Sequence, residues 1–374
     1  MNSQSNRLAN FDLLRIISMF MIVSFHCVYH GNFDYSGSFT TTHWILKEFW
    51  LLGELGVNLF MLITGYFMAN GKFNLHKLIK IVVQLYCFNF VSCVLNWTIE
   101  LPNGASLMDL LTPLVLPISQ RVYWYITVYI MIYIFSPYIN CFIKSISQKD
   151  FANLLMISFV LWSVFPTTLG WAIGVESDLH YYNRFIWCIF IYLLGAYIRL
   201  YSLSIINTKK AALTLTCACF FVASIAIPII AFVNSRFNLS IEPAYFWHPN
   251  TVIMLFMSIG VFGLAKHTNV PNWKMISILA STTTGIYMLH DGKLRYFLWQ
   301  TLFPNAQHQE SPWLILYILL SALAVFILGA LLDLGWQKAT QKLIYKRDKI
   351  SKDTWIVQKS ASIASTLYQF FNIK

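Results

Sequence analysis

The first apolar segment of the chain, FDLLRIISMFMIVSFHCVYHG at residues 11–31, carries two ionisable side chains that could do chemistry, Arg15 and His26. Their spacing of eleven residues returns to within about 20° of one helix face, with a rise of roughly 16 Å. Asp12 lies one turn before Arg15 and can pair with it. Because ionisable groups are costly in a membrane helix, this face is a candidate site. In the structural alternative, Arg15 reaches the interface and His26 hydrogen-bonds a neighbouring helix.

The composition indicates an integral membrane protein. Hydrophobic residues make up 57% and charged residues 11% of the chain, and the mean hydropathy is +0.60, whereas a soluble domain carries about twice that charge. The sequence lacks β-barrel alternation, so apolar runs of about 20 residues are expected to be helices. We predict an all-α, polytopic membrane helix bundle with about ten transmembrane helices, near residues 11–30, 50–70, 78–98, 122–143, 151–173, 184–201, 211–233, 250–265, 276–296 and 313–334.

The basic residues indicate how the bundle is oriented. They gather near the N-terminus, in alternate connections and in the C-terminal tail, whereas the intervening connections collect acidic residues such as Asp34, Glu100 and Glu176. Since cytoplasmic loops carry the excess of Lys and Arg, both termini are predicted to be cytoplasmic. We expect residues 1–335 to form the transmembrane domain and residues 336–374 a basic amphipathic cytoplasmic tail. The formal charge of +11 then reflects topology and attraction to an anionic lipid bilayer, with no nucleic acid as partner.

No motif in the sequence indicates a bound cofactor or a metal. The seven cysteines all fall in apolar segments, and an odd number without loop spacing does not form a disulfide framework. Cys217 and Cys219 point to different sides of a helix and have no histidine or aspartate beside them, so we assign no metal site. A glycine-rich phosphate loop and a Gly-x-Ser-x-Gly nucleophile elbow are also missing.

Four segments, taken in order, resemble those of a known family. They are the Arg-x10-His spacing of the first helix, GVNLFMLITGYFM at 56–68, RVYWYITVYIMIYIFSPYI at 121–139 and TTGIYMLHD at 283–291. Together they resemble the acyltransferase 3 family of membrane O-acyltransferases over about residues 7–335. Thr64 stands where the family usually has Ser, and Met61 stands where it usually has Phe. These departures put no chemistry in doubt.

The resemblance implies an activity. Members of the family take an acyl group, most often acetyl, from cytoplasmic acyl-CoA and deliver it to a hydroxyl of an extracytoplasmic glycan or lipid-linked sugar. Their first-helix histidine is regarded as catalytic, which makes His26 a general base or a transient acyl carrier. Acetyl-CoA or another acyl-CoA is thus the expected donor substrate, and a multi-pass location in the cell (plasma) membrane is expected. The residues after Gly335 are too few for the hydrolase-like domain of some members, so this chain would complete the transfer itself or with a separate partner.

The expected depths of the candidate residues divide them into two groups. Helix rise places His26, Glu54 and His290 toward the outer leaflet, and Asp12 and Arg15 toward the cytoplasm. Acyl transfer to a sugar hydroxyl needs a base, an orienter, a group that stabilises the oxyanion and stacking surfaces, and basic groups could hold the phosphates of CoA. We assign as catalytic His26, Arg15 and Glu54; as donor-binding Arg15, Lys77 and Lys80; as acceptor-binding Arg121, Trp124, Tyr125 and His290; and as structural support Asp12 and Asn58.

Each assignment leaves a structural alternative open. The outer carboxylate and arginine could be interfacial anchors, His290 could cap its helix, the aromatic pair could belong to an interfacial belt, and Lys77 and Lys80 could be ordinary positive-inside residues. For the whole chain, the alternative is a glycolipid or polysaccharide transporter or flippase whose buried charges line a conduit. Such a protein is expected to show paired repeats or Gly/Pro-broken helices, which the sequence does not clearly contain. The acceptor sugar, the acyl chain and the oligomeric state stay open.

Overall fold

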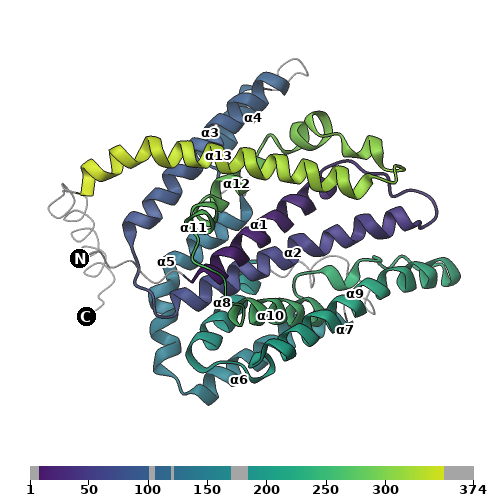
Figure 1. Ribbon diagram of the computed structural model, residues 1–374, viewed down its shortest axis with the longest axis horizontal. Helices are drawn as coiled ribbons and strands as arrows, with labels where there is room; N and C mark the ends of the chain where they lie inside the picture. The colour runs from purple at the N-terminus through teal and green to yellow at the C-terminus, as the bar shows by residue number, and fades with distance from the viewer. Residues whose placement is uncertain (1–7, 101–105, 119–121, 170–183, 349–374) are drawn as a thin grey trace.

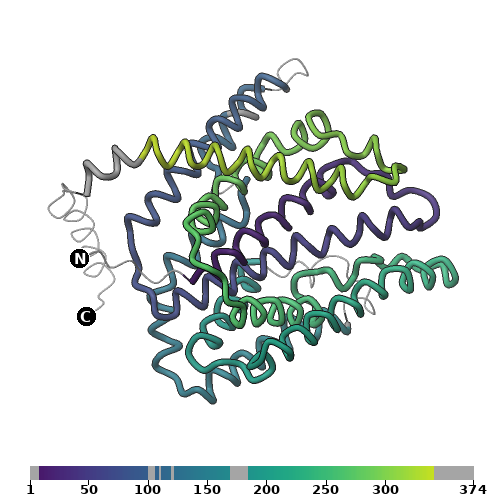
Figure 2. Tube along the Cα trace, viewed as in Figure 1, coloured from purple at the N-terminus to yellow at the C-terminus, as the bar shows by residue number. Residues whose placement is uncertain are grey.

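The computed structural model describes residues 8–100, 106–118, 122–169 and 184–348, and within these ranges the chain forms helices and connections without a strand (Figure 1, Figure 2). Eight described helical stretches are long and apolar enough to cross a membrane, which confirms an all-α, polytopic architecture. They are α1 (Ala9–Tyr29), α2 (Thr41–Met68), α3 (Leu75–Glu100), α5 (Trp124–Ser145), α6 (Gln148–Phe159) with its continuation through a π-helical turn (Val160–Val164) into α7 (Phe165–Leu169), α8 (Arg184–Tyr201), α9 (Lys209–Phe237) and α13 (Leu314–Asp348).

Two stretches differ from their predicted boundaries. The span predicted at 250–265 is α10 (Val252–Lys266), which has 15 residues, fewer than the roughly 20 that usually cross the hydrocarbon core. The last span, predicted to end near residue 334, continues as α13 to Asp348. The first part of the predicted tail is therefore a continuation of a membrane helix, and residues 349–374 lie outside the described residues.

The helix that carries Arg15 and His26, α1, lies centrally in the bundle and contacts α2, α10, α11, α12 and α13 (Figure 1). Gly56 allows α2 to approach α1 closely, because a Cβ at this position would lie 2.8 Å from the backbone oxygen of Ser18. In the same way, a Cβ at Gly65 would meet the backbone of α8. These close approaches hold α1 and α2 in a fixed relation, which fixes the side chains on their facing surfaces.

The span predicted at 276–296 is interrupted. It contains two short helices, α11 (Lys274–Ser281) and α12 (Thr283–His290). At the interruption, the Thr282 hydroxyl donates to the carbonyl of Leu279 at 2.8 Å, a bond that competes with the helical hydrogen-bond ladder. The side-chain amide of Gln337 in α13 donates to the carbonyl of Ser281 at 3.2 Å. α12 therefore starts anew at this point and packs against α1, α3 and α13.

The connection from α9 to α10 is held against the start of α2. Glu242 in this connection pairs with Lys47 of α2 at 2.9 Å, and the Lys47 ammonium lies 3.8 Å from the centroid of the Trp50 ring. Tyr35, in the connection that follows α1, lies beside the same ammonium at 4.8 Å. Burial raises the pKa of Tyr35 to about 12, so its hydroxyl stays protonated. The segments after α1 and after α9 thus meet around one lysine.

Candidate active site

A cavity of about 1630 Å³ lies between α1, α2, α3, α5, α8 and α12, and the connection after α9 also lines it. Arg15 and His26 both line this cavity, as their shared helix face predicted. The predicted residues that also line it are Asp12, Glu54, Lys77, Lys80, Trp124 and Tyr125. The structure therefore brings most of the assigned donor, acceptor and catalytic residues into one space.

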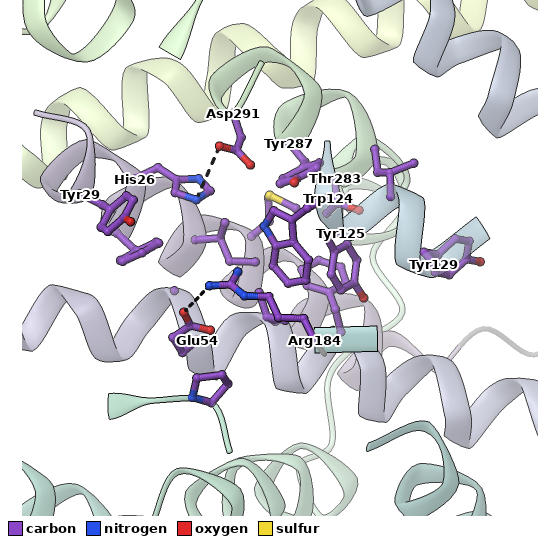
Figure 3. Close-up of a pocket in the computed structure, with 18 of the residues that line it drawn as sticks. His26, Tyr29, Glu54, Trp124, Tyr125, Tyr129, Arg184, Thr283, Tyr287 and Asp291 are labelled. Carbon is purple, nitrogen blue, oxygen red and sulfur yellow. Dashed lines mark ion pairs between the residues drawn. The ribbon is translucent and has the colours of Figure 1, made fainter. Parts of the chain in front are cut away.

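At one end of the cavity, three buried side chains face one another. His26 comes from α1, His30 follows α1 directly and Asp291 follows α12 directly; we call these three residues the histidine end. One oxygen of Asp291 lies 3.9 Å from Nε2 of His26 and 3.5 Å from Nε2 of His30. The Arg295 guanidinium lies 3.4 Å from the same oxygen. Figure 3 shows His26 and Asp291 pointing toward each other from their two elements.

The two ring nitrogens of His26 have different surroundings. A neutral imidazole carries an N–H on one nitrogen and a lone pair on the other. Because Nε2 of His26 faces the Asp291 carboxylate, we assign the N–H to Nε2 and the lone pair to Nδ1. Nδ1 is buried and has no hydrogen-bond partner among the described residues. When Nδ1 accepts a proton, the nearby carboxylate stabilises the imidazolium that forms.

His290 lies close to His26 but does not line the cavity. The two ring centroids are 5.0 Å apart, and the His290 side chain is fully buried. Its Nδ1 lies 2.6 Å from the carbonyl of Ile286, one turn earlier in α12. Its Nε2 is buried and has no hydrogen-bond partner among the described residues, and the assignment of His290 to the acceptor site stays a prediction.

Tyr287 presents a hydroxyl to the same region from one turn before Asp291. The side chain lines the cavity, and its hydroxyl is buried without a hydrogen-bond partner in the described part of the chain. The ring of Tyr125 lies 6.3 Å away, centroid to centroid. A buried, unpartnered hydroxyl beside a cavity is suited to donate to an oxygen that becomes negative during a reaction.

Glu54, assigned as the carboxylate that orients His26, has another partner. Its carboxylate lies 4.0 Å from the Arg184 guanidinium at the start of α8, and within the described ranges no ion pair joins it to His26. Arg184 also lies over the ring of Trp124, 4.6 Å from its centroid. Figure 3 shows the Arg184 side chain between Glu54 and Trp124. Among the described residues, the carboxylate that faces His26 is therefore that of Asp291, and Glu54 lies with Arg184 and Trp124 on the aromatic side of the cavity.

Two of the other residues assigned to the acceptor site lie at the start of α5. Trp124 and Tyr125 begin α5 and line the cavity. Arg121 lies outside the described residues, so this assignment stays a prediction. Asn58 supports the same region: its side-chain amide donates to the carbonyl of Pro249 at 2.9 Å, and its oxygen accepts from the Trp187 indole at 2.9 Å. This buried amide ties α2 to α8 and to the connection after α9, as expected of a supporting residue.

The other end of the cavity holds Asp12, Arg15, Lys77 and Lys80, which we call the arginine end. Nη1 of Arg15 donates to Asp12 at 2.7 Å, so the predicted pair forms. The Ser277 hydroxyl of α11 donates to the second carboxylate oxygen of Asp12 at 3.4 Å. The Asp12 side chain is 1% exposed and that of Arg15 is 26% exposed. The aspartate therefore anchors the guanidinium while part of it stays accessible from the cavity.

Four residues of the site were not assigned from the sequence: His30, Tyr287, Asp291 and Arg184. His30 stands one helical turn after His26, a spacing that places both on one face. Tyr287 and Asp291 both occur in the TTGIYMLHD segment that helped to identify the family resemblance. Arg184 opens an apolar span on the side predicted to be extracytoplasmic. Each thus had a local signal, but the side chain that it faces is far away in the sequence.

Comparison with known proteins identifies a family for this chain. A family model described as an acyltransferase domain matches residues 8–332, a range that includes both ends of the cavity. Comparisons with curated proteins and with solved structures give no match. Since the matched range covers most of the chain, this protein belongs to the acyltransferase 3 family of membrane acyltransferases.

Proposed function

We propose that this membrane acyltransferase is an O-acyltransferase and that the acyl group it transfers is acetyl. It takes the group from a cytoplasmic acyl-CoA and transfers it to a hydroxyl of an extracytoplasmic or lipid-linked glycan. The surroundings of the His26 ring support the proposal most directly. Its Nε2 faces Asp291, and its Nδ1 is buried and has no hydrogen-bond partner among the described residues. This arrangement is suited to remove a proton from a hydroxyl.

The chemical step balances with the groups in the cavity. Nδ1 of His26 accepts the proton of the acceptor hydroxyl as its oxygen attacks the thioester carbonyl carbon. The carbonyl oxygen becomes negative in the tetrahedral intermediate, and the Tyr287 hydroxyl is suited to donate a hydrogen bond to it. The carbon–sulfur bond then breaks, and His26 returns the proton to the sulfur. One thioester and one alcohol thereby give one ester and free CoA.

The arginine end is the proposed donor site. CoA carries phosphates, and the cationic side chains of Arg15, Lys77 and Lys80 line the cavity at that end. Arg15 and His26 are roughly 16 Å apart along α1, a span of the same order as the extended pantetheine arm. The nucleotide can therefore remain at the arginine end while the thioester carbonyl reaches the histidine end.

The acceptor is proposed to bind where Glu54, Arg184 and Trp124 line the cavity. Carboxylates and guanidinium groups hydrogen-bond sugar hydroxyls, and a tryptophan face packs against the apolar face of a sugar ring. This region adjoins the histidine end, since Trp50 and Glu54 of α2 line the same cavity as His26. A glycan bound there lies next to the histidine end and leaves the donor in its own end of the cavity.

The proposal is tested on the purified full chain in lipid nanodiscs. Radiolabelled acetyl-CoA is supplied with p-nitrophenyl glycosides and, separately, with lipid-linked glycans extracted from membranes. We expect free CoA and acetyl ester to form in equal amounts, and His26→Ala to lower the rate by about 10²–10⁴-fold. His308→Ala, which changes an exposed histidine, is the control and should retain the wild-type rate. A wild-type protein that moves glycolipid across the membrane without consuming acetyl-CoA would favour the transporter alternative instead.

The same protein distinguishes a base from an acyl carrier. Incubation with labelled acetyl-CoA and no acceptor, followed by denaturation and rapid separation, reports any acyl group bound to the chain. A general base leaves the chain unlabelled, because no bond forms between His26 and the acyl carbon. Label that is present in the wild type and missing in His26→Ala would show a covalent carrier. The acyl group would then pass first to His26 and from there to the acceptor, in two separate steps.

A further inference from the structure

The histidine end has the composition of a transition-metal site. His26, His30 and Asp291 each offer one ligand atom, and the three atoms all lie within 4.8 Å of one another. All three residues are buried. Two imidazoles and one carboxylate form a donor set used by catalytic zinc sites, in which a fourth position is left for water.

We propose that this cluster binds one divalent transition-metal ion, with Zn²⁺ as the best fit, and that the bound ion inhibits acyl transfer. The ligands are Nε2 of His26, Nε2 of His30 and one oxygen of Asp291. Metal binding rests on the geometry of the cluster alone. The inhibition rests also on the function proposed above, because it concerns His26 as a base.

The positions of the ligand atoms need only a modest adjustment. Bonds of about 2.0–2.1 Å at tetrahedral angles put ligand atoms roughly 3.3 Å apart. The Asp291 oxygen lies 3.5 Å from His30 and 3.9 Å from His26, which is close to this value. His26 and His30 stand at i and i+4 at the C-terminal end of α1, where His30 caps the helix, and this spacing allows two histidines to bind the same ion. The two imidazole nitrogens must approach by at most about 1.5 Å, which ring rotation can supply.

The positive charge of Arg295 disfavours binding of the metal ion. Its guanidinium lies 3.4 Å from the Asp291 oxygen that would bind the metal, and two cations repel each other at this range. The Arg295 side chain is 32% exposed and lines the cavity, so it has space to turn away from the carboxylate. His290 is the other titratable group beside His26, and its Nδ1 is engaged by a carbonyl of α12. Removal of the Arg295 charge should therefore strengthen metal binding, the opposite of the effect of losing a ligand.

A metal ion on Nε2 of His26 would inhibit acyl transfer because it determines which ring nitrogen carries the proton. A metal on Nε2 uses the lone pair of that nitrogen, so the single N–H of the neutral ring must lie on Nδ1. Nδ1 is the nitrogen that accepts the proton in the proposed step. The metal also takes the carboxylate that would stabilise the imidazolium. A chain with the ion bound keeps its fold and its cavity but has lost its base.

Binding is measured on the full chain, purified in detergent with a tag that contains no histidine and treated with EDTA. The probe is ZnCl₂ alone, and isothermal titration with metal analysis after dialysis gives the stoichiometry and the Kd. We expect one Zn²⁺ per wild-type chain and a Kd that rises at least about tenfold in His30→Gln and in Asp291→Asn. Arg295→Gln should lower the Kd, and His308→Gln should leave it unchanged. Mg²⁺, which prefers oxygen ligands, should not compete.

Two results would overturn the metal site. One is the lack of saturable Zn²⁺ binding by a wild-type chain that elutes as a single folded species. The other is equal binding by the wild type, His30→Gln and Asp291→Asn. Because Asp291→Asn replaces a side chain by one of the same shape, it keeps the test valid if His30→Gln does not fold.

Inhibition is measured as CoA release with added Zn²⁺ and again after addition of EDTA. The wild-type rate should fall as the site fills and recover on chelation, and His30→Gln should need at least about tenfold more Zn²⁺ for the same fractional loss. Zn²⁺ binding without loss of rate would refute the inhibitory role and leave the acyl transfer proposal intact. Failure of the metal-free chain to transfer acyl groups would refute the proposed function, while the binding measurement would still decide the metal site.

Discussion

The arginine end and the histidine end of the cavity each include a side chain of α1, but their ionisable side chains differ in how far they are exposed. At the arginine end, the Arg15 side chain is 26% exposed and is paired with a buried aspartate. At the histidine end, the side chains of His26 and Asp291 are only 9% and 3% exposed. The first arrangement offers accessible positive charge, whereas the second holds a proton acceptor and its carboxylate away from water.

This difference fits two different tasks. Accessible cations attract a polyanion from solution, and salt screens that attraction. A proton transfer instead benefits from a buried pair, because electrostatic stabilisation is larger and less screened where water is excluded. The proposed function thus assigns recognition of the donor to one end and the chemical step to the other, and the following predictions test this division.

The largest expected effect concerns which end faces which side of the membrane. In a background without native cysteines, Ser38→Cys lies in the exposed connection after α1, and Lys72→Cys lies in the exposed turn after α2. With both termini cytoplasmic, a membrane-impermeant thiol reagent added to intact cells should label residue 38 and leave residue 72 unlabelled. The reverse pattern would place the histidine end in the cytoplasm and remove the proposed route of the donor. Labelling of both positions after permeabilisation is the control.

The second prediction concerns Asp291 at the histidine end. Asp291→Asn keeps the size of the side chain but removes the charge that stabilises the His26 imidazolium, so kcat should fall by about 10²–10⁴-fold. The KM for acyl-CoA should change little, since Asp291 is far from the arginine end. Asp34→Asn, an exposed aspartate in the connection after α1, serves as the matched control and should keep the wild-type kcat. Activity near wild type in a well-folded Asp291→Asn protein would show that another group assists His26.

The long membrane helices were predictable because their signal is local. An apolar run of about 20 residues has few other stable states in a bilayer, so α1, α3 and α5 were located from hydropathy alone. The interruption at Thr282 was not predicted, because residues 276–289 carry no charged side chain and read as one apolar run. What ends α11 is a hydroxyl bond to Leu279 and an amide supplied by Gln337 of another helix. Hydropathy carries no information about such contacts.

The residues of the candidate site also fall into those that local spacing predicts and those that depend on contacts between distant segments. The Arg15–His26 pair and its supporting Asp12 depend on spacing within one helix, and the structure brings all three to the cavity. The carboxylate that faces His26 is that of Asp291, which follows α12 and is far from His26 in the sequence. Glu54 was assigned instead, since its depth matched that of His26. Depth gives one coordinate only, and the structure shows that the side chain of Glu54 turns to Arg184.

A smaller effect is expected at the arginine end. The double variant Lys77→Gln/Lys80→Gln removes two of its cations, and each lost contact to phosphate is worth about 1 kcal/mol near a charged surface. The KM for acetyl-CoA should therefore rise by roughly 30-fold, with kcat unchanged at saturation. The rise in KM with added salt should also be weaker than in the wild type. Lys72→Gln, which changes an exposed lysine that does not line the cavity, is the control.

An unchanged KM in the double lysine variant, together with a raised KM for acetyl-CoA in Glu54→Ala, would show that the donor binds at the other end. The comparison of the two ends would then have to be reversed. A fall in kcat with no change in either KM would instead place the lysines in the chemical step.

The smallest expected effect is on the acceptor, at Trp124. A sugar ring that packs on this indole gains about 0.5–1.5 kcal/mol from the aromatic contact, so Trp124→Leu should raise the KM for the acceptor by roughly 2–10-fold. Trp124→Phe keeps an aromatic face and should lose less. Because Arg184 lies over this ring, Arg184→Gln is expected to raise the acceptor KM as well, through loss of the group that holds the indole in place. The KM for acetyl-CoA should stay at its wild-type value in all three variants, and Trp44→Leu, at an exposed tryptophan that does not line the cavity, is the control. A raised KM for acetyl-CoA alone would move Trp124 from the acceptor to the donor site.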